Sequence, residues 1–339
     1  MDIEKLTATA NALVAEGKGI LAADESFGTI EKRFKKIGIP STEANRQAYR
    51  EMLFTTKGAE AFISGVILFD ETLRQTTAGG TPFTKVLSDV GTIPGIKVDT
   101  GAKTLAGFPG EKVTEGLDGL RDRLAEYAKL GARFAKWRAV ITIGDGLPTA
   151  FCIKANAHAL ARYAALTQEA GLVPIVEPEV LMDGRHTIER CDEVTEATLK
   201  RVYGELHRHR VVLEGTLLKP NMVLSGKECA QQAGVEQVAA MTVRCLRRCV
   251  PAAVPGIVFL SGGQSPEEAT AHLSAMNALG THPWELSFSY GRALQAPALD
   301  AWAGKAANVP AGQKAYYHRA KLNGAARSGS YTSAMESAA

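Results

Sequence analysis

The chain has 339 residues, of which 45% are hydrophobic and 22% are charged, and its formal net charge is +3. This composition is typical of a globular protein with a full core, and so small and scattered a charge argues against a nucleic-acid partner. The sequence shows neither a signal-peptide pattern nor a run of about 18 apolar residues, so we expect neither secretion nor a membrane span.

The predicted elements alternate between short apolar strands and longer amphipathic helices. The first 15 or so residues indicate an extra helix. Eight strand-like runs follow, which begin near Ile20, Gly65, Gly95, Phe134, Val173, Val211, Gly256 and Glu285. Apolar residues at three- and four-residue spacing predict helices between them, over 117–130, 155–170, 195–209, 235–250 and 266–279. Eight strand–helix units predict an α/β fold, a closed (β/α)8 TIM barrel.

The chain shows no linker rich in Pro, Gly or Ser, which predicts one catalytic domain over residues 1–324. The segment 325–339 is poor in large apolar residues, and we expect it to be a flexible C-terminal tail. Five cysteines form no paired framework and no metal-type doublet, which favours a reducing cytoplasm. They are Cys152, Cys191, Cys229, Cys245 and Cys249.

Polar and charged residues stand at the C-terminal end of each predicted strand, where the chemistry of a barrel enzyme gathers. In chain order they are Asp24; Asp70 and Glu71; Lys97 and Asp99; Lys136 and Arg138; Glu177 and Glu179; Lys219; Ser261, Gly262 and Gly263; and Ser289, Gly291 and Arg292. Residues two apart on a strand share a face, so several of these can point into the barrel together. A solvated sheet edge is a poor explanation, because a closed barrel has no free edge.

Lys219 ends a mostly apolar run from Val211 to Leu218, and Pro220 stops the strand there. An ammonium group held against apolar walls loses hydration, so part of it becomes a neutral amine that can attack a carbonyl. Lys219 is therefore a candidate Schiff-base lysine. A lysine whose ammonium reaches out to solvent at a strand end is the alternative.

Ser261-Gly262-Gly263 offers consecutive backbone amides, and the next helix begins with Ser265-Pro266-Glu267-Glu268, a capping box with Pro at its first position. Backbone donors beside a helix N-terminus suit an anion. Arg292 after the last strand adds a fork-shaped cation. These features predict a phosphate site.

Seven motifs together resemble class I fructose-bisphosphate aldolase, in order from about Gly17 to about Lys305. They are GILAADES at 19–26, GVILF at 65–69, FAKWR at 134–138, VPIVEPE at 173–179, LEGTLLKPNM at 213–222, FLSGGQ at 259–264 and FSYGR at 288–292. Motifs of this length, number and order are highly specific. The resemblance implies a cofactor-free and metal-free lyase that reversibly splits fructose 1,6-bisphosphate into dihydroxyacetone phosphate and glyceraldehyde 3-phosphate, in glycolysis, gluconeogenesis or the Calvin cycle.

The resemblance also implies roles for single residues. Lys219 matches the lysine that attacks the C2 ketone, and Glu177 matches the general acid/base. Lys136 would lie beside Lys219 and favour its neutral form by like-charge repulsion. Asp24 would counter these cations and hold the C4 hydroxyl, and Glu179 would support the site or relay charge. A helix N-cap role for Asp24 and helix-facing ion pairs for the two glutamates are the alternatives.

For the phosphates, the resemblance assigns Ser261, Gly262, Gly263, Gly291 and Arg292 to the C1 end. The C6 end would be met by Thr29, Lys32, Arg33 and Lys97, although Lys32 and Arg33 alone could be solvated helix charges. We also expect Ser289 and Arg138 among the substrate-binding residues.

The chain departs from the family pattern at three places. Thr29 stands for a family serine and keeps the hydroxyl, and Phe27 replaces a small residue in the first strand–helix loop. The printed chain ends in Ala338-Ala339, whereas close relatives of the animal enzyme end in a tyrosine that assists proton exchange at C3. We therefore expect slower or different C3 protonation, and Tyr331 is not assigned this role.

Three other functions fit part of the pattern. A zinc-dependent class II aldolase needs histidines at strand ends, but the seven histidines lie in helical or loop patterns. Another Schiff-base sugar-phosphate barrel enzyme, such as a transaldolase, would lack the second phosphate cluster. A scaffold protein that kept the barrel has no need of the intact charged set. Small sugar phosphates are the expected partners, with no nucleic acid or membrane, and the resemblance implies a homotetramer.

Overall fold

The computed structural model describes residues 1–337, and within them eight parallel strands close into a barrel. The strand order around it is β1-β10-β9-β8-β7-β6-β3-β2. This confirms the predicted (β/α)8 architecture and its eight strands, although the sixth begins later than predicted. The strands are β1 (Gly19–Ala23), β2 (Ile63–Leu68), β3 (Ile93–Lys97), β6 (Phe134–Ile141), β7 (Val173–Val180), β8 (Leu217–Leu218), β9 (Gly256–Phe259) and β10 (Glu285–Tyr290).

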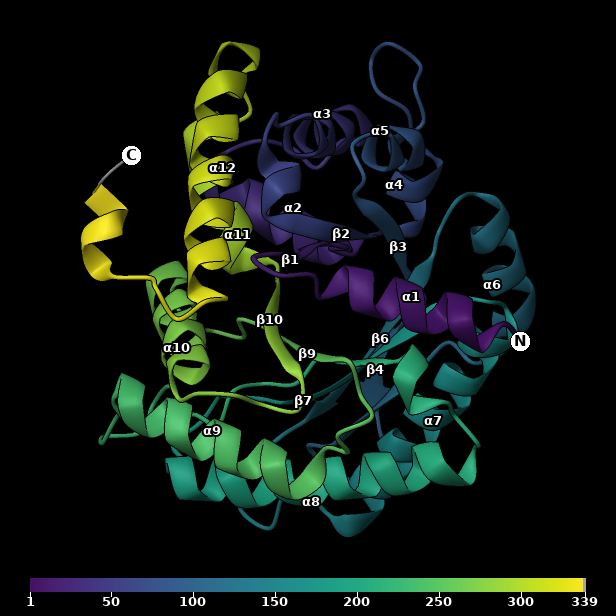
Figure 1. Cartoon of the computed structure of the whole chain (residues 1–339), viewed down its shortest axis with the longest axis vertical. Coiled ribbons are helices and arrows are strands. Elements are labelled where there is room, and N and C mark those ends of the chain that lie inside the picture. Colours follow the sequence, from purple (N-terminus) through teal and green to yellow (C-terminus); the bar gives the residue numbers. More distant parts are fainter. Residues whose placement is uncertain (338–339) are drawn as a thin grey trace.

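Helices surround the strands, with α8 and α9 along the lower edge and α12 upright at the left of Figure 1. The first helix and the five predicted inter-strand helices are confirmed. The α-helices are α1 (Ile3–Leu13), α2 (Phe27–Lys36), α3 (Glu43–Phe54), α4 (Asp70–Arg74), α5 (Phe83–Asp89), α6 (Leu120–Lys129), α7 (Ala150–Glu169), α8 (Ile188–Arg208), α9 (Val235–Cys249), α10 (Pro266–Ala278), α11 (Arg292–Trp302) and α12 (Val309–Ala326). Within residues 1–337, no helix combines the length and the apolar character that crossing a membrane requires.

The sixth predicted strand is much shorter than expected. The run that begins at Val211 forms a 3-10 turn, η2 (Leu213–Gly215), and only Leu217–Leu218 is strand. The side chain of Gln168 explains the difference, because it binds the backbone that a neighbouring strand would otherwise bind. Its amide nitrogen donates to the Val212 carbonyl at 2.8 Å, and its oxygen accepts from the Val212 amide at 3.0 Å.

A two-stranded antiparallel hairpin was not predicted. It consists of β4 (Gly101–Thr104) and β5 (Lys112–Glu115), which follow β3 and pair with each other outside the barrel. The run Lys112-Val-Thr-Glu115 contains two β-branched residues and lies shortly after Phe108-Pro-Gly110, so a hairpin signal is present but short. The hairpin brings Gly101 and Ala102 to the rim of the central cavity.

The helix α1 closes the N-terminal end of the barrel. Leu6, Leu13 and Val14 are buried in one cluster with residues of the barrel interior such as Phe134 and Val258. Glycines at that end leave the space for this packing: a Cβ on Gly256 would lie 2.5 Å from Val14 Cγ1. The opposite, C-terminal end of the strands is left for the site.

Arg327 joins the two ends of the chain. Its buried guanidinium donates to the carbonyls of Val14 at 2.8 Å and Lys18 at 2.9 Å, and to the carbonyl of Leu286. Farther along, η4 (Ser333–Ser337) carries Glu336, whose carboxylate pairs with buried Arg319 at 2.6 Å. The division into a 1–324 domain and a 325–339 tail stays a prediction, and residues 338–339 lie outside the described part.

Candidate active site

An open cavity of about 850 Å³ lies at the C-terminal ends of the barrel strands. Its size is ordinary for a small-molecule site. The structure brings together at this cavity all but one of the predicted site residues: Asp24, Thr29, Lys32, Arg33, Lys97, Lys136, Arg138, Glu177, Glu179, Lys219, Ser261, Gly262, Ser289, Gly291 and Arg292 line it. Only Gly263 of the predicted set does not.

Four buried charged side chains form a contiguous cluster at the cavity. Lys219 Nζ lies 3.3 Å from one carboxylate oxygen of Glu177, and Lys136 Nζ lies 3.2 Å from the other. Lys136 Nζ also lies 2.7 Å from Asp24 Oδ2. Each of these side chains is at most 13% exposed, so water screens their charges little. Two cations and two carboxylates thus hold one another in place.

Asp24 and Lys136 are held in their charged forms. Burial alone would raise the pKa of Asp24, but the cations Lys136, Lys219 and Lys97 outweigh it, and its pKa is lowered. Burial alone would lower the pKa of Lys136, but Asp24, Glu177 and Asp99 outweigh it, and its pKa is raised. Lys136 is therefore a permanent cation over the physiological range, and Asp24 a permanent anion.

The strands determine which side chains meet. Register pairs Lys136 of β6 with Ile175 of β7, and Arg138 with Glu177, so these polar residues occupy neighbouring levels of the barrel. Lys219 follows β8, and its backbone amide still donates to the Val176 carbonyl at 2.8 Å. Pro220 has no amide to continue the ladder, so the chain leaves the barrel just after the lysine.

Three further predicted residues form ion pairs along the wall. Glu179 accepts from the guanidinium of Arg138, one level nearer the mouth than Glu177. The ammonium of Lys97 lies 2.7 Å from Asp99 Oδ1. Glu179 thus faces the cavity rather than a helix. Among the described residues its ion pair is with Arg138 and not with Lys219. Asp24 is not a helix N-cap, since Ser26 occupies that position of α2.

One end of the cavity is built from the loops after β9 and β10. Arg292 donates to the Gly262 carbonyl, which brings the guanidinium next to the Ser261–Gly262 backbone. The buried hydroxyl of Ser289 has no hydrogen-bond partner among the described residues, so it is available to a ligand. The amide of Gly263 instead donates to Met182 Sδ at 3.0 Å, which is why this glycine does not face the cavity.

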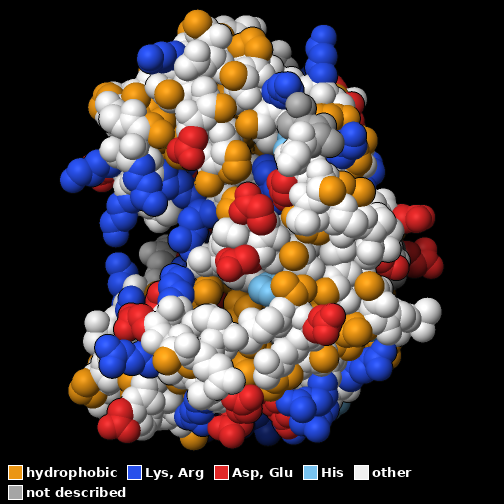
Figure 2. All heavy atoms as spheres, turned by 90° about the vertical axis from the view of Figure 1, so that its left-hand side faces the viewer, with side chains coloured by type: hydrophobic (Ala, Val, Ile, Leu, Met, Phe, Trp, Pro, Cys, Tyr) orange, Lys and Arg blue, Asp and Glu red, His pale blue; other side chains and the backbone are white. Residues whose placement is uncertain are grey.

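The other end is cationic and lies along α2. Thr29, Lys32, Arg33 and Lys36 of this helix line the cavity, and Figure 2 shows Lys and Arg side chains gathered around a hollow at the left edge of that face. Sequence reasoning missed Lys36 and Glu25. Glu25 is a buried carboxylate that binds Arg33 and Arg50 together, and no short motif around it signals such a role.

A protein-family model described as fructose-bisphosphate aldolase class-I matches residues 5–339. The chain belongs to the class I fructose-bisphosphate aldolase family. A probable class 1 aldolase of Xanthomonas campestris pv. campestris is 62% identical over 98% of this chain and 99% of its own. Cytosolic fructose-bisphosphate aldolase 4 of Arabidopsis thaliana is 57% identical over 96% and 84%.

A solved structure agrees with these relatives. It is the fructose-bisphosphate aldolase of Plasmodium falciparum in a ternary complex with TRAP and a small-molecule inhibitor. The TM-score is 0.96 at 52% identity, and the match covers 97% of this chain and 96% of that one. The family predicted from the seven motifs is thus confirmed. Its members are lyases that reversibly split fructose 1,6-bisphosphate through a lysine Schiff base, and this chain is such a class I aldolase. The class II, transaldolase-type and scaffold alternatives are set aside.

Proposed function

We propose that Lys219 is the lysine that forms the Schiff base with the C2 carbonyl of the substrate. The observation that carries this assignment is the position of its Nζ, buried at the cavity and 3.3 Å from Glu177. Lys136 is the only competitor in the cluster. Two carboxylates hold its ammonium, at 2.7 and 3.2 Å, which keeps its proton in place and leaves Lys219 as the nucleophile.

Glu177 moves the protons of the reaction. Glu177 takes the proton that Lys219 gives up as its amine adds to C2 and forms a carbinolamine, and it passes that proton to the departing hydroxyl, which leaves as water. The resulting iminium accepts the electron pair when the C3–C4 bond breaks, while the C4 hydroxyl loses its proton to the carboxylate. Glyceraldehyde 3-phosphate departs, C3 of the enamine is protonated, and water releases dihydroxyacetone phosphate from the lysine.

Lys136 and Asp24 support these reaction steps through their charges. The fixed cation of Lys136 lies 3.2 Å from the Glu177 carboxylate, which in turn contacts Lys219, and so holds the acid/base in place beside the nucleophile. Asp24, kept ionised by the surrounding lysines, would accept a hydrogen bond from the C4 hydroxyl. Glu179 holds Arg138 at the wall and is a positioning residue in this proposal.

The two ends of the cavity take the two phosphates. Ser261, Gly262, Ser289, Gly291 and Arg292 would bind the phosphate at C1, since they offer backbone amides, a partnerless hydroxyl and a guanidinium. The phosphate at C6 would meet Thr29, Lys32, Arg33 and Lys97. Gly263 would not bind the phosphate directly, because its amide donates to Met182. Sugar phosphates are the substrates that such a doubly cationic cavity suits.

The test is borohydride reduction in the presence of dihydroxyacetone phosphate and EDTA, followed by peptide mass mapping. We expect a reduced triose phosphate adduct on Lys219 and loss of activity. Lys219→Met should give no adduct and no turnover while its circular dichroism stays native, and the exposed Lys85→Met should behave like wild type. An adduct on another lysine, or normal turnover of Lys219→Met, would overturn the assignment.

We also propose that the enzyme works in the cytoplasm as a homotetramer. The cysteines are free, and the Arabidopsis relative is named as cytosolic. The tetramer rests on resemblance to the family.

A further inference from the structure

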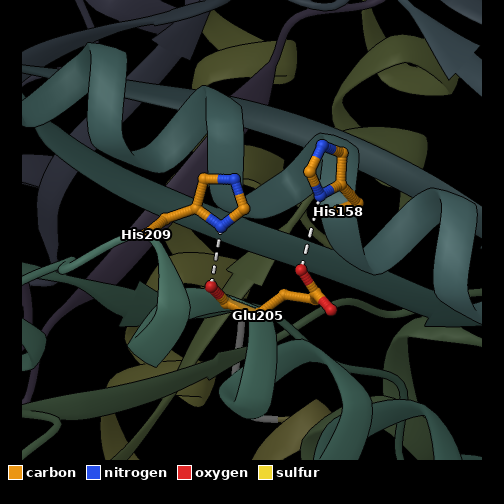
Figure 3. Close-up of side chains that lie close together, drawn as sticks. All are labelled: His158, Glu205 and His209. Carbon is orange, nitrogen blue, oxygen red and sulfur yellow. Dashed lines mark hydrogen bonds and ion pairs between the residues drawn. The ribbon is translucent and has the colours of Figure 1, made fainter.

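A second group of candidate ligands lies away from the aldolase cavity. His158 on α7 and Glu205 and His209 at the C-terminal end of α8 bring their potential metal-binding atoms within 4.8 Å of one another (Figure 3). None of the three lines the active-site cavity. The aldolase reaction therefore gives no reason for this arrangement of two imidazoles and a carboxylate.

His209 is oriented as metal-binding histidines usually are. Its Nδ1 lies 2.8 Å from the backbone carbonyl of Glu205, so Nδ1 carries the proton and Nε2 keeps its lone pair. A hydrogen bond from the second ring nitrogen to a carbonyl is the common outer-shell partner of a histidine ligand. In Figure 3 the other nitrogen of the His209 ring faces His158. The two ring centroids are 4.9 Å apart.

Glu205 supplies the negative charge. Its side chain is only 7% exposed, and one oxygen, Oε2, lies 3.4 Å from His158 Nδ1. Arg208 holds the other oxygen at 2.6 Å, which leaves Oε2 directed at the imidazoles. The carboxylate is thus held toward the imidazoles without any metal.

We propose that His158, Glu205 and His209 bind one divalent transition-metal ion, with Zn²⁺ as the ion that the ligands suit best. Two imidazole nitrogens and one carboxylate oxygen are a three-ligand set that zinc commonly takes, with water in the fourth position. The ion would take the place of the hydrogen bond between His158 Nδ1 and Glu205 Oε2.

The geometry needs only a small closure. Zinc–ligand bonds of about 2.0–2.1 Å place tetrahedral ligand atoms about 3.3 Å apart, so atoms now within 4.8 Å must approach by up to about 1.5 Å. The His158 side chain is 51% exposed and can turn toward the other two without displacing core residues. Glu205 and His209, four residues apart, already share one face at the end of α8.

The bound ion would join α7 to α8. Because the site exists only in the folded chain, zinc would stabilise the protein by mass action. Its action is structural: the ion would raise the unfolding temperature without entering the aldolase reaction, and activity assays in EDTA would not reveal it.

The experiment uses the full chain, purified without a polyhistidine tag and stripped with EDTA. Zn²⁺ binding is measured by calorimetry in a non-chelating buffer, and thermal unfolding is followed with and without Zn²⁺. We expect one ion per chain and a higher unfolding temperature. His158→Ala and His209→Ala should each weaken binding by at least about tenfold and remove the thermal shift. The exposed His207→Ala, on the same helix, is the matched control and should bind like wild type.

Cobalt distinguishes this site from the cysteine pair at Cys245 and Cys249. Co²⁺ bound to imidazole and carboxylate gives no thiolate-to-cobalt charge-transfer band, and we expect none. The proposal is overturned if wild type binds no zinc, if both histidine variants keep full affinity, or if Cys249→Ser abolishes binding. Cys249→Ser should therefore retain the ion.

Discussion

The charged residues of the active site are mutually dependent. Lys136 contacts both Asp24 and Glu177, and Glu177 in turn contacts Lys219. Removing one member leaves a buried, unpaired charge, which costs more than the pair contributes. Substitutions in this cluster will therefore affect folding as well as catalysis, and turnover of such variants has to be read beside their stability.

Arg292 allows a cleaner prediction, because its guanidinium lies at the mouth and its removal leaves no buried carboxylate without a partner. Arg292→Ala should raise KM for fructose 1,6-bisphosphate by roughly 10- to 100-fold, since a charge-assisted bond to phosphate contributes about 1.5–3 kcal/mol. Steady-state kinetics measure this, with the exposed Arg121→Ala as control. A KM within twofold of wild type would contradict the assignment of Arg292 to the phosphate site.

At the residue scale, most of the site residues predicted from long motifs lie at one cavity, and their roles stay predictions. Lys219 could be located because Pro220 ends its strand within a ten-residue match. The sequence could not show that Gly262 lines the cavity and Gly263 does not, because the direction of each amide depends on the backbone conformation. Gly262 has a positive φ of 57°, and this turns the amide of Gly263 toward Met182. Glu25 was missed because its partner Arg50 is 25 residues away.

At the element scale, the contact between α1 and the barrel depends on glycine. In Gly256→Ala the new methyl group would lie 2.5 Å from Val14 Cγ1 and 3.0 Å from its Cβ. We expect a loss of about 1–3 kcal/mol in the free energy of unfolding, as is typical of overpacking. Denaturant titration checks it.

Two companion variants make that test specific. Gly204→Ala, in α8 with no atom within 4 Å of the new methyl group, should be neutral or stabilising by up to about 1 kcal/mol. Adding Val14→Ala to Gly256→Ala should cost less than the sum of the two single changes. Strict additivity would show that the strain lies elsewhere.

The helix α10 carries a pH-dependent contribution to stability. Burial lowers the pKa of His272 to about 4, and its ring donates from Nδ1 to Gln264 Oε1 at 2.6 Å. The unfolded chain binds a proton on this histidine near pH 6.5, so between there and about pH 4 it holds more protons than the folded chain. Stability is therefore complete above pH 6.5 and falls as the pH drops to about 4, by on the order of 3 kcal/mol.

His272→Gln should flatten the profile of unfolding temperature against pH between 6.5 and 4, whereas His207→Gln, at an exposed position, should not. Parallel profiles for His272→Gln and wild type would contradict the assignment.

The elements themselves were predictable to different degrees. Strands and helices with strong periodicity, such as β7 and α9, were found almost to the residue. The sixth strand was overestimated because the prediction gave too little weight to Glu214 and Gly215, which lie in the 3-10 turn, and because a local pattern does not show that Gln168 binds this backbone. Tertiary partners of this kind are invisible to a local pattern.

At the scale of the whole molecule, assembly is the property that one chain does not display. Sedimentation velocity should give a species of four chains of 36.1 kDa each, if the tetramer inferred from the family holds. The mass should not change with EDTA, since the proposed ion joins two helices of a single chain. A monomer at micromolar concentration would refute the tetramer.

The closure of the barrel by α1 also determines the order in which the protein can be completed during synthesis. The helix leaves the ribosome first, yet Val14 packs against Gly256 and its carbonyl accepts from Arg327. Those partners emerge only when most of the chain has been translated. The apolar face of the first helix therefore stays exposed until the last segments have been synthesised. We expect chaperones to bind a nascent chain that stalls before residue 256.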